Sequence, residues 1–253
     1  MYQEERLQKI LTYLQENKRI HVDDICQLYA VSRDTARRDL VKLEERQQII
    51  RTHGGALLST MQREIKNYQD RLHYSQNEKR IIGKLAASLI QNGDKLILDA
   101  STTVQACADY LTAEHCTIIT NSVHQAALLA HKPDREIHLL GGRLDNEHHF
   151  LYGPQVLSTL SHYFVNKVFI GVVGITGKGL TSGSEEDGHV VRKMIEQAEQ
   201  VIVLADHSKF GRNGYFKYAD LADIDLIVTD QPPSEPYAAL CRKNQIHVLF
   251  PQK

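Results

Sequence analysis

Basic side chains gather in the stretch from residue 33 to residue 46, where they follow the order Ser32-Arg33-Asp34-Thr35-Ala36-Arg37-Arg38. Arginine can donate two hydrogen bonds to the edge of a guanine, and hydroxyl and cationic groups bind phosphate oxygens. The chemistry that this stretch offers is therefore nucleic-acid binding. The alternative is that the arginines only solvate an exposed helix and pair with carboxylates nearby, namely Asp34, Asp39, Glu44 and Glu45.

A second group of polar residues, Asp99-Ala100-Ser101-Thr102-Thr103, follows the β-prone run from Lys95 to Leu98 and precedes a helical stretch. A strand that leads into a hydroxyl-rich turn at a helix N-terminus presents free amides, hydroxyl groups and a positive dipole end at one place. This arrangement suits a phosphate group. The alternative is a capped helix that binds no ligand.

Other predicted strand ends also carry polar residues: Thr120-Asn121-Ser122, Gly141-Gly142-Arg143, Gly171 to Gly174, and Ala205 to Gly211. Ligands collect beyond the carboxyl ends of parallel strands. We expect Lys209 to neutralise a phosphate and Asp99, Asn121 or Glu185 to hold sugar hydroxyls. The alternative is that the glycines only make turns and that Lys209 is a surface cation. The predicted effector-binding residues are Asp99, Ser101, Thr102, Thr103, Asn121, Ser122, Gly142, Arg143, Gly171, Glu185 and Lys209.

Three helices and a hairpin are predicted to position the basic residues. Apolar residues recur at helical spacing over residues 4–16 and 21–30. Ser32 is a good N-cap for a third helix, whose inward stripe would be Ala36, Leu40 and Leu43. Two β-prone runs surround the glycines of residues 48–57, which predicts a wing. In this winged helix-turn-helix the predicted DNA-binding residues are Ser32, Arg33, Thr35, Arg37, Arg38, Lys42, Arg51 and His53.

The remainder of the chain alternates helical stretches with short β-branched runs at residues 95–98, 117–120, 136–140, 167–172, 200–204 and 225–228. Such alternation is typical of a largely parallel sheet covered by helices. We therefore predict an α/β fold class with a winged helix-turn-helix domain at residues 1–58, a linker at residues 59–77 and an effector-sensing α/β domain at residues 78–253.

Bulk properties limit the function further. The formal net charge of the 253 residues is -1, so any DNA contact must come from a local patch. The four cysteines form no CxxC pair, which favours reduced packing residues over a zinc site or disulfides. No apolar stretch approaches the roughly 20 residues of a membrane span, and the N-terminus does not resemble a secretion signal. We expect a cytoplasmic protein with no membrane partner and no cofactor.

The segments Ser32 to Leu40 and Arg51-Thr52-His53-Gly54-Gly55-Ala56 resemble the DNA-binding signature of DeoR-family bacterial transcription regulators. The resemblance extends from about residue 78 to residue 230 through D-x-S-T-T, T-N-S, L-G-G and A-D-H-S-K-F-G. It implies a third helix that reads operator DNA, usually to repress a sugar-utilisation operon. It also implies a homo-oligomer, and a sensor domain similar in fold to ribose-5-phosphate isomerase that binds a phosphorylated sugar or polyol. Many members have D-x-G-T-T, so Ser101 leaves the identity of the effector open.

The alternative function is an active sugar-phosphate isomerase with a DNA-binding appendage. Isomerases of this fold resemble D-G-A-D-E followed by K-G-G-G, whereas this chain has Ile170-Gly171-Val172-Val173-Gly174 and then Thr181-Ser182-Gly183-Ser184. Both the acidic pair and the lysine are missing from the motif, so we expect a regulator and not an enzyme. We expect Glu185, Glu186 and Asp187 to be a solvated helix N-terminus, and His148-His149 to belong to a surface loop without a metal.

Overall fold

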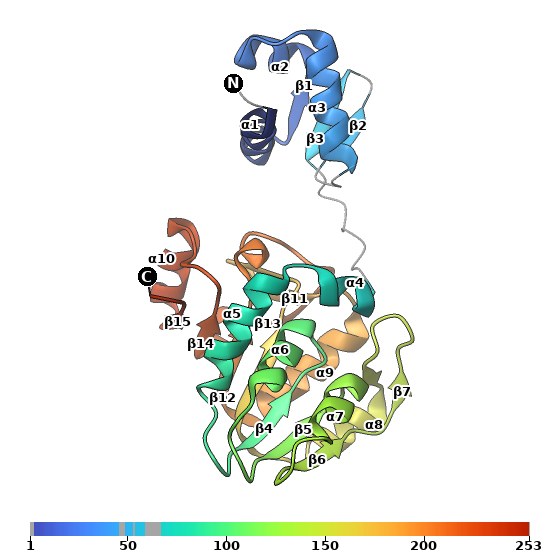
Figure 1. Cartoon of the computed structure of the whole chain (residues 1–253), viewed down its shortest axis with the longest axis vertical. Coiled ribbons are helices and arrows are strands. Elements are labelled where there is room, and N and C mark those ends of the chain that lie inside the picture. The colour runs from blue at the N-terminus through green and yellow to red at the C-terminus, as the bar shows by residue number, and fades with distance from the viewer. Residues whose placement is uncertain (1–2, 46–48, 53, 59–66, 253) are drawn as a thin grey trace. The chain divides into compact units, whose positions relative to one another are not determined.

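The computed structural model describes residues 3–45, 49–52, 54–58 and 67–252, and the chain divides into two compact units, Met1–Ile65 and Lys66–Lys253 (Figure 1). The smaller unit is the DNA-binding unit and the larger one the sensor unit. The predicted position His53 lies outside the described residues, as does most of the predicted linker.

The DNA-binding unit contains three helices and a three-stranded antiparallel sheet. The helices are α1 (Gln3–Asn17), α2 (Val22–Tyr29) and α3 (Arg33–Glu45), and the strands β1 (Arg19–His21), β2 (Ile49–Thr52) and β3 (Gly55–Leu58) lie in the order β1-β3-β2. The apolar positions predicted from spacing, including Ala36, Leu40 and Leu43, are buried in one core. The predicted winged helix-turn-helix is therefore confirmed.

Two details of this unit differ from the prediction. Strand β1 was missed because its three residues follow a polar break and pair with β3 only in the folded unit. Leu28, one of the apolar residues at helical spacing in the range 21–30 that we expected to be buried, is 52% exposed. An eight-residue helix is anchored here mainly by Ile25, which is fully buried.

A seven-stranded parallel sheet is the centre of the sensor unit (Figure 1). Its strands are β4 (Lys95–Leu98), β5 (Thr117–Thr120), β6 (Glu136–Leu139), β9 (Val165–Gly171), β12 (Ala198–Leu204), β14 (Leu226–Val228) and β15 (His247–Leu249). They lie in the order β15-β14-β12-β9-β4-β5-β6. From β4 the chain builds outward to β6, then returns to β9 on the other side of β4 and builds outward again. The strand order therefore reverses between β4 and β9.

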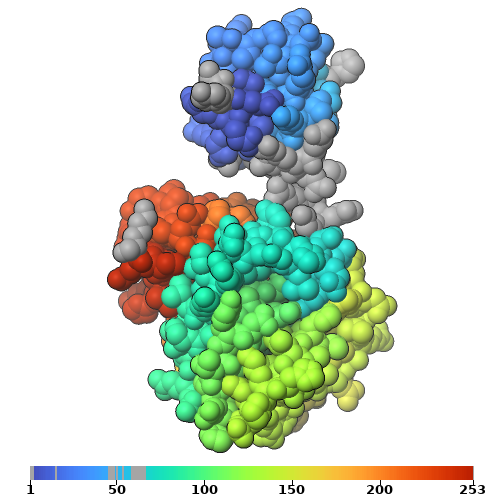
Figure 2. All heavy atoms as spheres, in the orientation of Figure 1, coloured from blue at the N-terminus to red at the C-terminus, as the bar shows by residue number. Residues whose placement is uncertain are grey.

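Helices cover both faces of this sheet. One apolar core packs one face against α5 (Gln76–Ala87), α6 (Thr102–Tyr110) and α7 (Val123–Leu129). A second core packs the other face against α8 (Pro154–Leu160), α9 (Glu185–Glu196) and α10 (Glu235–Lys243). The short helix α4 (Tyr68–His73) precedes α5. In Figure 2 the side of α5 and α6 forms a continuous teal-to-green surface.

The six strands predicted in this unit are all present in the main sheet, and β4 and β5 have the predicted bounds. Smaller sheets were not predicted. Strands β10 (Gly174–Thr176), β11 (Gly179–Ser182) and β13 (Phe216–Ala219) form one of them, and β7 (Arg143–Leu144) and β8 (Leu151–Tyr152) form a hairpin. Cys107, Cys116 and Cys241 are buried and unpaired. In the part of the chain that the structure describes, no helix has the length and apolar character needed to cross a membrane.

Candidate functional sites

The outward face of α3 carries the residues predicted to contact DNA. Ser32 precedes the helix and its Oγ accepts a hydrogen bond from the backbone N of Thr35 at 3.2 Å, so the predicted N-cap is confirmed. The side chains of Arg37, Arg38 and Lys42 are exposed. A cap at this position fixes where the helix begins and hence which side chains its first turns present.

Some of these basic residues have a polar side-chain partner within the unit, and others do not among the described residues. Arg33 forms a bidentate pair with Asp23 at the start of α2, and Arg51 of the wing pairs with Glu44 at 3.2 Å. Lys42 donates to Gln3 Oε1 at 2.6 Å. Arg37 and Arg38, by contrast, have no ion-pair partner among the described residues. Among the described residues, these two arginines are therefore the ones whose guanidinium groups no carboxylate holds.

Asp39 has a structural role in this unit. The carboxylate is fully buried and accepts hydrogen bonds from Arg6 Nε at 2.5 Å, Arg6 Nη2 at 3.1 Å and Gln3 Nε2 at 2.9 Å. The hydrogen bond to Asp39 raises the pKa of Arg6. The aspartate of the T-x-R-R-D-L segment therefore ties α3 to α1 and does not face DNA.

The two glycines of the wing are required for different structural reasons. Gly54 has a φ of +95°, a left-handed conformation that glycine adopts without strain. Gly55 pairs with His21 across β1 and β3, and a Cβ there would lie 2.2 Å from the carbonyl oxygen of Ile20. The sheet of the winged unit closes only if this position has no side chain.

In the sensor unit, the carboxyl ends of β4 and β9 meet where the strand order reverses, which is the place where open parallel sheets bind ligands. Asp99 follows β4 and is buried. Its Oδ2 accepts from the backbone N of Gly171, at the end of β9, and its Oδ1 from that of Ser101, both at 2.8 Å. Burial nonetheless raises the pKa of Asp99 to about 6.

Ser101 and Gly171 pack directly against one another at this point. Ser101 Oγ caps α6 by accepting from the backbone N of Val104 at 3.0 Å. A Cβ at Gly171 would lie 2.3 Å from Ser101 Oγ, so only glycine fits the end of β9. The structure thus brings three predicted effector-binding residues into contact, while Thr102 and Thr103 begin the adjacent helix and are buried.

Cations gather beside this loop. Lys79 of α5 is only 8% exposed, and burial, together with the nearby Lys209 and Arg71, lowers its pKa to about 8. Its Nζ donates to the carbonyl oxygen of Arg71 in α4. A buried lysine whose charged form is disfavoured by two neighbouring cations indicates a positive site, which suits an anion. Lys209 was predicted from its motif; Lys79 and Arg71 were not.

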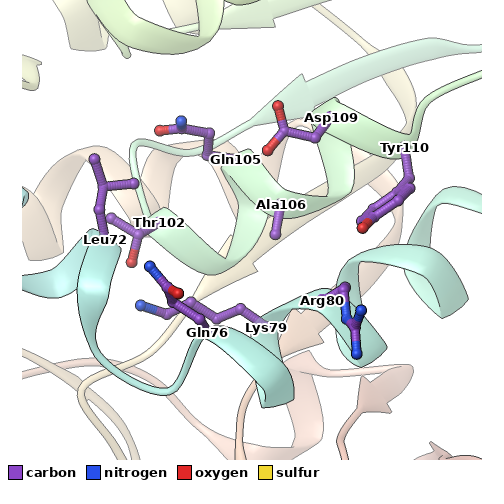
Figure 3. A pocket seen from close by; sticks show the side chains of 9 residues that line it. All are labelled: Leu72, Gln76, Lys79, Arg80, Thr102, Gln105, Ala106, Asp109 and Tyr110. Carbon is purple, nitrogen blue, oxygen red and sulfur yellow. The ribbon is translucent and has the colours of Figure 1, made fainter.

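Close packing of two helices places Lys79 there. Gly83, one turn further along α5, lies so near α6 that a Cβ would be 2.6 Å from the backbone of Ala106. A cavity of about 190 Å³ opens between these helices and is lined by Lys79, Thr102, Gln105 and Asp109 among others (Figure 3). In Figure 3, Lys79 and Gln76 extend below Thr102, whereas Arg80 lies toward Tyr110.

Asp187 corrects the prediction made for the acidic run. Glu185 and Glu186 are exposed in the first turn of α9, as expected. Asp187 instead interacts with Asp99 and Arg71, and desolvation followed by the Asp99 charge raises its pKa to about 7. Glu185, the residue predicted to hold a hydroxyl, pairs with His189 at 3.3 Å. The inward carboxylate of this turn is therefore two residues beyond the predicted one.

The remaining predicted residues lie at neighbouring strand ends. Asn121 is 1% exposed and donates to the carbonyl oxygen of Leu151 at 3.1 Å, while Ser122 caps α7. Gly142 packs so closely on Tyr152 that a Cβ would be 2.6 Å from its carbonyl oxygen. Arg143 is exposed on the β7–β8 hairpin.

The adjacent histidines diverge. The Nδ1 atom of His149 is 2.7 Å from Nε2 of His124, whose ring stacks on Tyr68 with centroids 4.2 Å apart. His148 is half-buried, and its Nδ1 is buried without a hydrogen-bond partner among the described residues. The two histidines lie in the loop between β7 and β8, as expected, but His149 also packs against His124 and Tyr68.

A winged helix-turn-helix joined to an α/β unit with a charged strand-end site defines a DNA-binding regulator with a small-molecule sensor. The model of the DeoR-like helix-turn-helix domain matches residues 6–62, and that of the DeoR C terminal sensor domain matches residues 74–231. The chain belongs to the DeoR family of transcription regulators.

Curated relatives agree with this membership. The chain is 54% identical over 253 residues to the HTH-type transcriptional repressor GlcR of Bacillus subtilis (strain 168), covering 100% of this chain and 98% of the relative. It is 32% identical over 237 residues to the glycerol-3-phosphate regulon repressor of Escherichia coli (strain K12), covering 92% and 93% of the two chains. The prediction of a regulator rather than an enzyme is confirmed by these relatives.

Solved structures similar to the chain include ribose 5-phosphate isomerase A from Methanocaldococcus jannaschii. The match has 16% sequence identity and a TM-score of 0.38, and it covers 53% of this chain and 54% of that one. The family assignment does not depend on this similarity.

Proposed function

We propose that the protein is a cytoplasmic repressor of a sugar or polyol utilisation operon, and that a phosphorylated metabolite controls its affinity for the operator. The names of the two relatives support repression, and that of the second refers to a phosphorylated polyol. The observation that carries the proposal is the convergence of Lys79, Lys209 and the N-terminus of α6 beside Asp99, at the reversal of strand order.

In this proposal the cations and the start of α6 bind the phosphate, and carboxylates hold the hydroxyl groups. The effector-binding residues are Asp99, Ser101, Thr102, Thr103, Asn121, Ser122, Gly142, Gly171 and Lys209, joined by Lys79 and Asp187. Arg143 and Glu185 are left out because their side chains are exposed and Glu185 has a partner in His189.

Operator DNA is bound by α3 and the wing, through Ser32, Arg33, Thr35, Arg37, Arg38, Lys42, Arg51 and His53. Arg37 and Arg38 carry most of the contact energy because no carboxylate of the described residues pairs with them. The protein acts as a homo-oligomer, since paired readers match operator half-sites spaced by whole turns of DNA.

Two measurements test the proposal. Thermal unfolding of the full chain in a panel of phosphorylated sugars and polyols should identify the effector, because a ligand of the folded state raises its stability. Anisotropy titrations with DNA from upstream of the gene's own neighbourhood should show a salt-sensitive preference over scrambled DNA, altered by that effector. If the protein shows no preference for this DNA, the proposed repressor function is wrong.

A further inference from the structure

Arg71 is a charged residue of the sensor unit that no sequence motif explains. It lies in α4, close to the boundary at Ile65 where the DNA-binding unit ends. Its Nε atom is buried and has no hydrogen-bond partner among the described residues. Leaving a buried donor of a charged group unsatisfied costs stability, and burial lowers the pKa of Arg71. Such a group is typical of a position that binds a ligand rather than of one that packs a core.

Charged groups face Arg71 from several elements. Asp187 of α9, Asp99 after β4 and Asp145 of the β7–β8 hairpin attract it, Asp187 most strongly. On the other side, Arg71 disfavours the charged forms of Lys79 and His148. The guanidinium therefore interacts both with a group of carboxylates and with Lys79 of the proposed phosphate site.

Helix α4 is attached to the sensor unit at both ends of its first turn. The backbone N of Tyr68 donates to the carbonyl oxygen of Glu147 at 3.1 Å, and the Tyr68 hydroxyl donates to Gln105 of α6. One turn later the carbonyl oxygen of Arg71 accepts from Lys79 Nζ. Arg71 thus interacts with the site electrostatically through its side chain and by a hydrogen bond through its backbone, so a change in the site acts directly on α4.

We propose that Arg71 binds the anionic group of the effector together with Lys79, and that this contact fixes α4 when the site is occupied. The inference rests on the phosphate site of the proposed function. Without an anion, the guanidinium is attracted by the three carboxylates. An anion bound beside Lys79 attracts the guanidinium toward Lys79 instead. Because α4 lies next to the DNA-binding unit in the chain, two positions of α4 give the effector a route to operator affinity by differential binding.

Hydrogen exchange of the full chain in inorganic phosphate, against chloride at the same ionic strength, tests this role. In the wild type, phosphate should slow exchange severalfold in residues 99–106, at the phosphate site, and in residues 67–74, which contain α4. Arg71→Gln should keep a smaller slowing at 99–106, because Lys79 and the start of α6 still bind phosphate, and should lose the slowing at 67–74. Arg242→Gln is the matched control, since it removes the same charge from an exposed position of α10 that does not line the cavity, and it should behave as the wild type.

The outcomes separate the two claims. If phosphate still slows exchange in residues 67–74 of Arg71→Gln, the role proposed for Arg71 is contradicted, while the phosphate site is still supported. If phosphate slows exchange in neither segment of the wild type, the proposed site is wrong and the role of Arg71 falls with it. Should Arg71→Gln fail to fold, Arg71→Lys serves in its place and should show a reduced effect at residues 67–74 only; a full effect contradicts the role.

Discussion

The two units of the chain bury charge in opposite ways. In the DNA-binding unit the buried Asp39 carboxylate accepts hydrogen bonds from Arg6 and Gln3 of the same unit. In the sensor unit Lys79, Asp99 and Asp187 have pKa values displaced toward their neutral forms. The buried polar atoms that lack a hydrogen-bond partner among the described residues all belong to the sensor unit: Arg71 Nε, Asn121 Oδ1, Gln125 Oε1, Arg135 Nε, His148 Nδ1 and Gln197 Oε1.

This difference indicates that the buried charges of the DNA-binding unit stabilise its fold, whereas those of the sensor unit are available to a ligand. A buried charge with its partner in place contributes to one fixed structure, whereas a cluster whose members disfavour one another's charge is stabilised when a ligand supplies the missing partner. We therefore expect substitution of the buried charges of the DNA-binding unit to lower its stability. Substitutions in the sensor unit should lower ligand response more than stability.

The largest effect is expected from Asp39→Ala. It leaves the Arg6 guanidinium buried without its partner, which costs about 3–5 kcal/mol, enough to unfold a unit of this size. Chemical denaturation followed by circular dichroism should show the DNA-binding unit unfolding early while the sensor unit is unchanged. Asp23→Ala breaks the exposed pair with Arg33 and should cost less than about 1 kcal/mol. Equal losses in the two variants would contradict the structural role of Asp39.

A smaller effect, confined to DNA binding, is expected from Arg37→Ala. Loss of one arginine contact to a base or phosphate costs about 1–3 kcal/mol, or roughly fivefold to 150-fold in operator affinity. Thermal stability should stay the same because Arg37 has no partner to lose within the described part of the unit. Lys9→Ala is the control because it removes the same charge from an exposed position of α1, and it should leave operator affinity nearly unchanged. The measurement is an anisotropy titration at fixed salt.

The smallest effect is a pH dependence carried by Asp187. Its pKa in the folded chain, about 7, lies above the ordinary value of 3.8, so the folded state binds more protons and stability rises as the pH falls through 7. From pH 8 to pH 6 this contribution is about 1 kcal/mol. Thermal unfolding at the two pH values should show the rise in the wild type and in the control Glu185→Gln. It should be largely absent in Asp187→Asn; a rise of full size there would assign the proton elsewhere.

Much of the fold follows from the sequence because its signals are local. The bounds of β4 and β5, the cap at Ser32 and the stripe of α3 depend on residues adjacent in the chain. The charged site was only half predicted for the opposite reason. Ser101 and Gly171 stand in recognisable loops, whereas Lys79 joins them only through the packing of α5 on α6 at Gly83.

The sequence did not identify Asp187 as the inward carboxylate of α9, because this depends on the rotational position of the helix. The acidic run from Glu185 to Asp187 starts α9, and the residue that turns inward depends on where Ser184 caps the helix. The cap is visible in the sequence, but the direction of the pocket requires the order of the strands. For the same reason Arg71 has no sequence signal: its charged neighbours Asp99, Asp145 and Asp187 come from three distant segments.

The most direct test of the account is Lys79→Met in the full chain. Burial lowers the pKa of Lys79 from 10.5 to about 8. Keeping Lys79 charged in the folded state therefore lowers the free energy of unfolding, by at most about 1.4 kcal/mol per pKa unit. Without ligand at pH 7, Lys79→Met should therefore unfold at a higher temperature than the wild type, while Lys243→Met, at an exposed position of α10, should not. With the phosphorylated ligand found by the thermal screen, the wild type should be stabilised and Lys79→Met should not. A Lys79→Met protein that is less stable without ligand, yet stabilised by the ligand as much as the wild type, would contradict the claim that this charge is kept for a ligand.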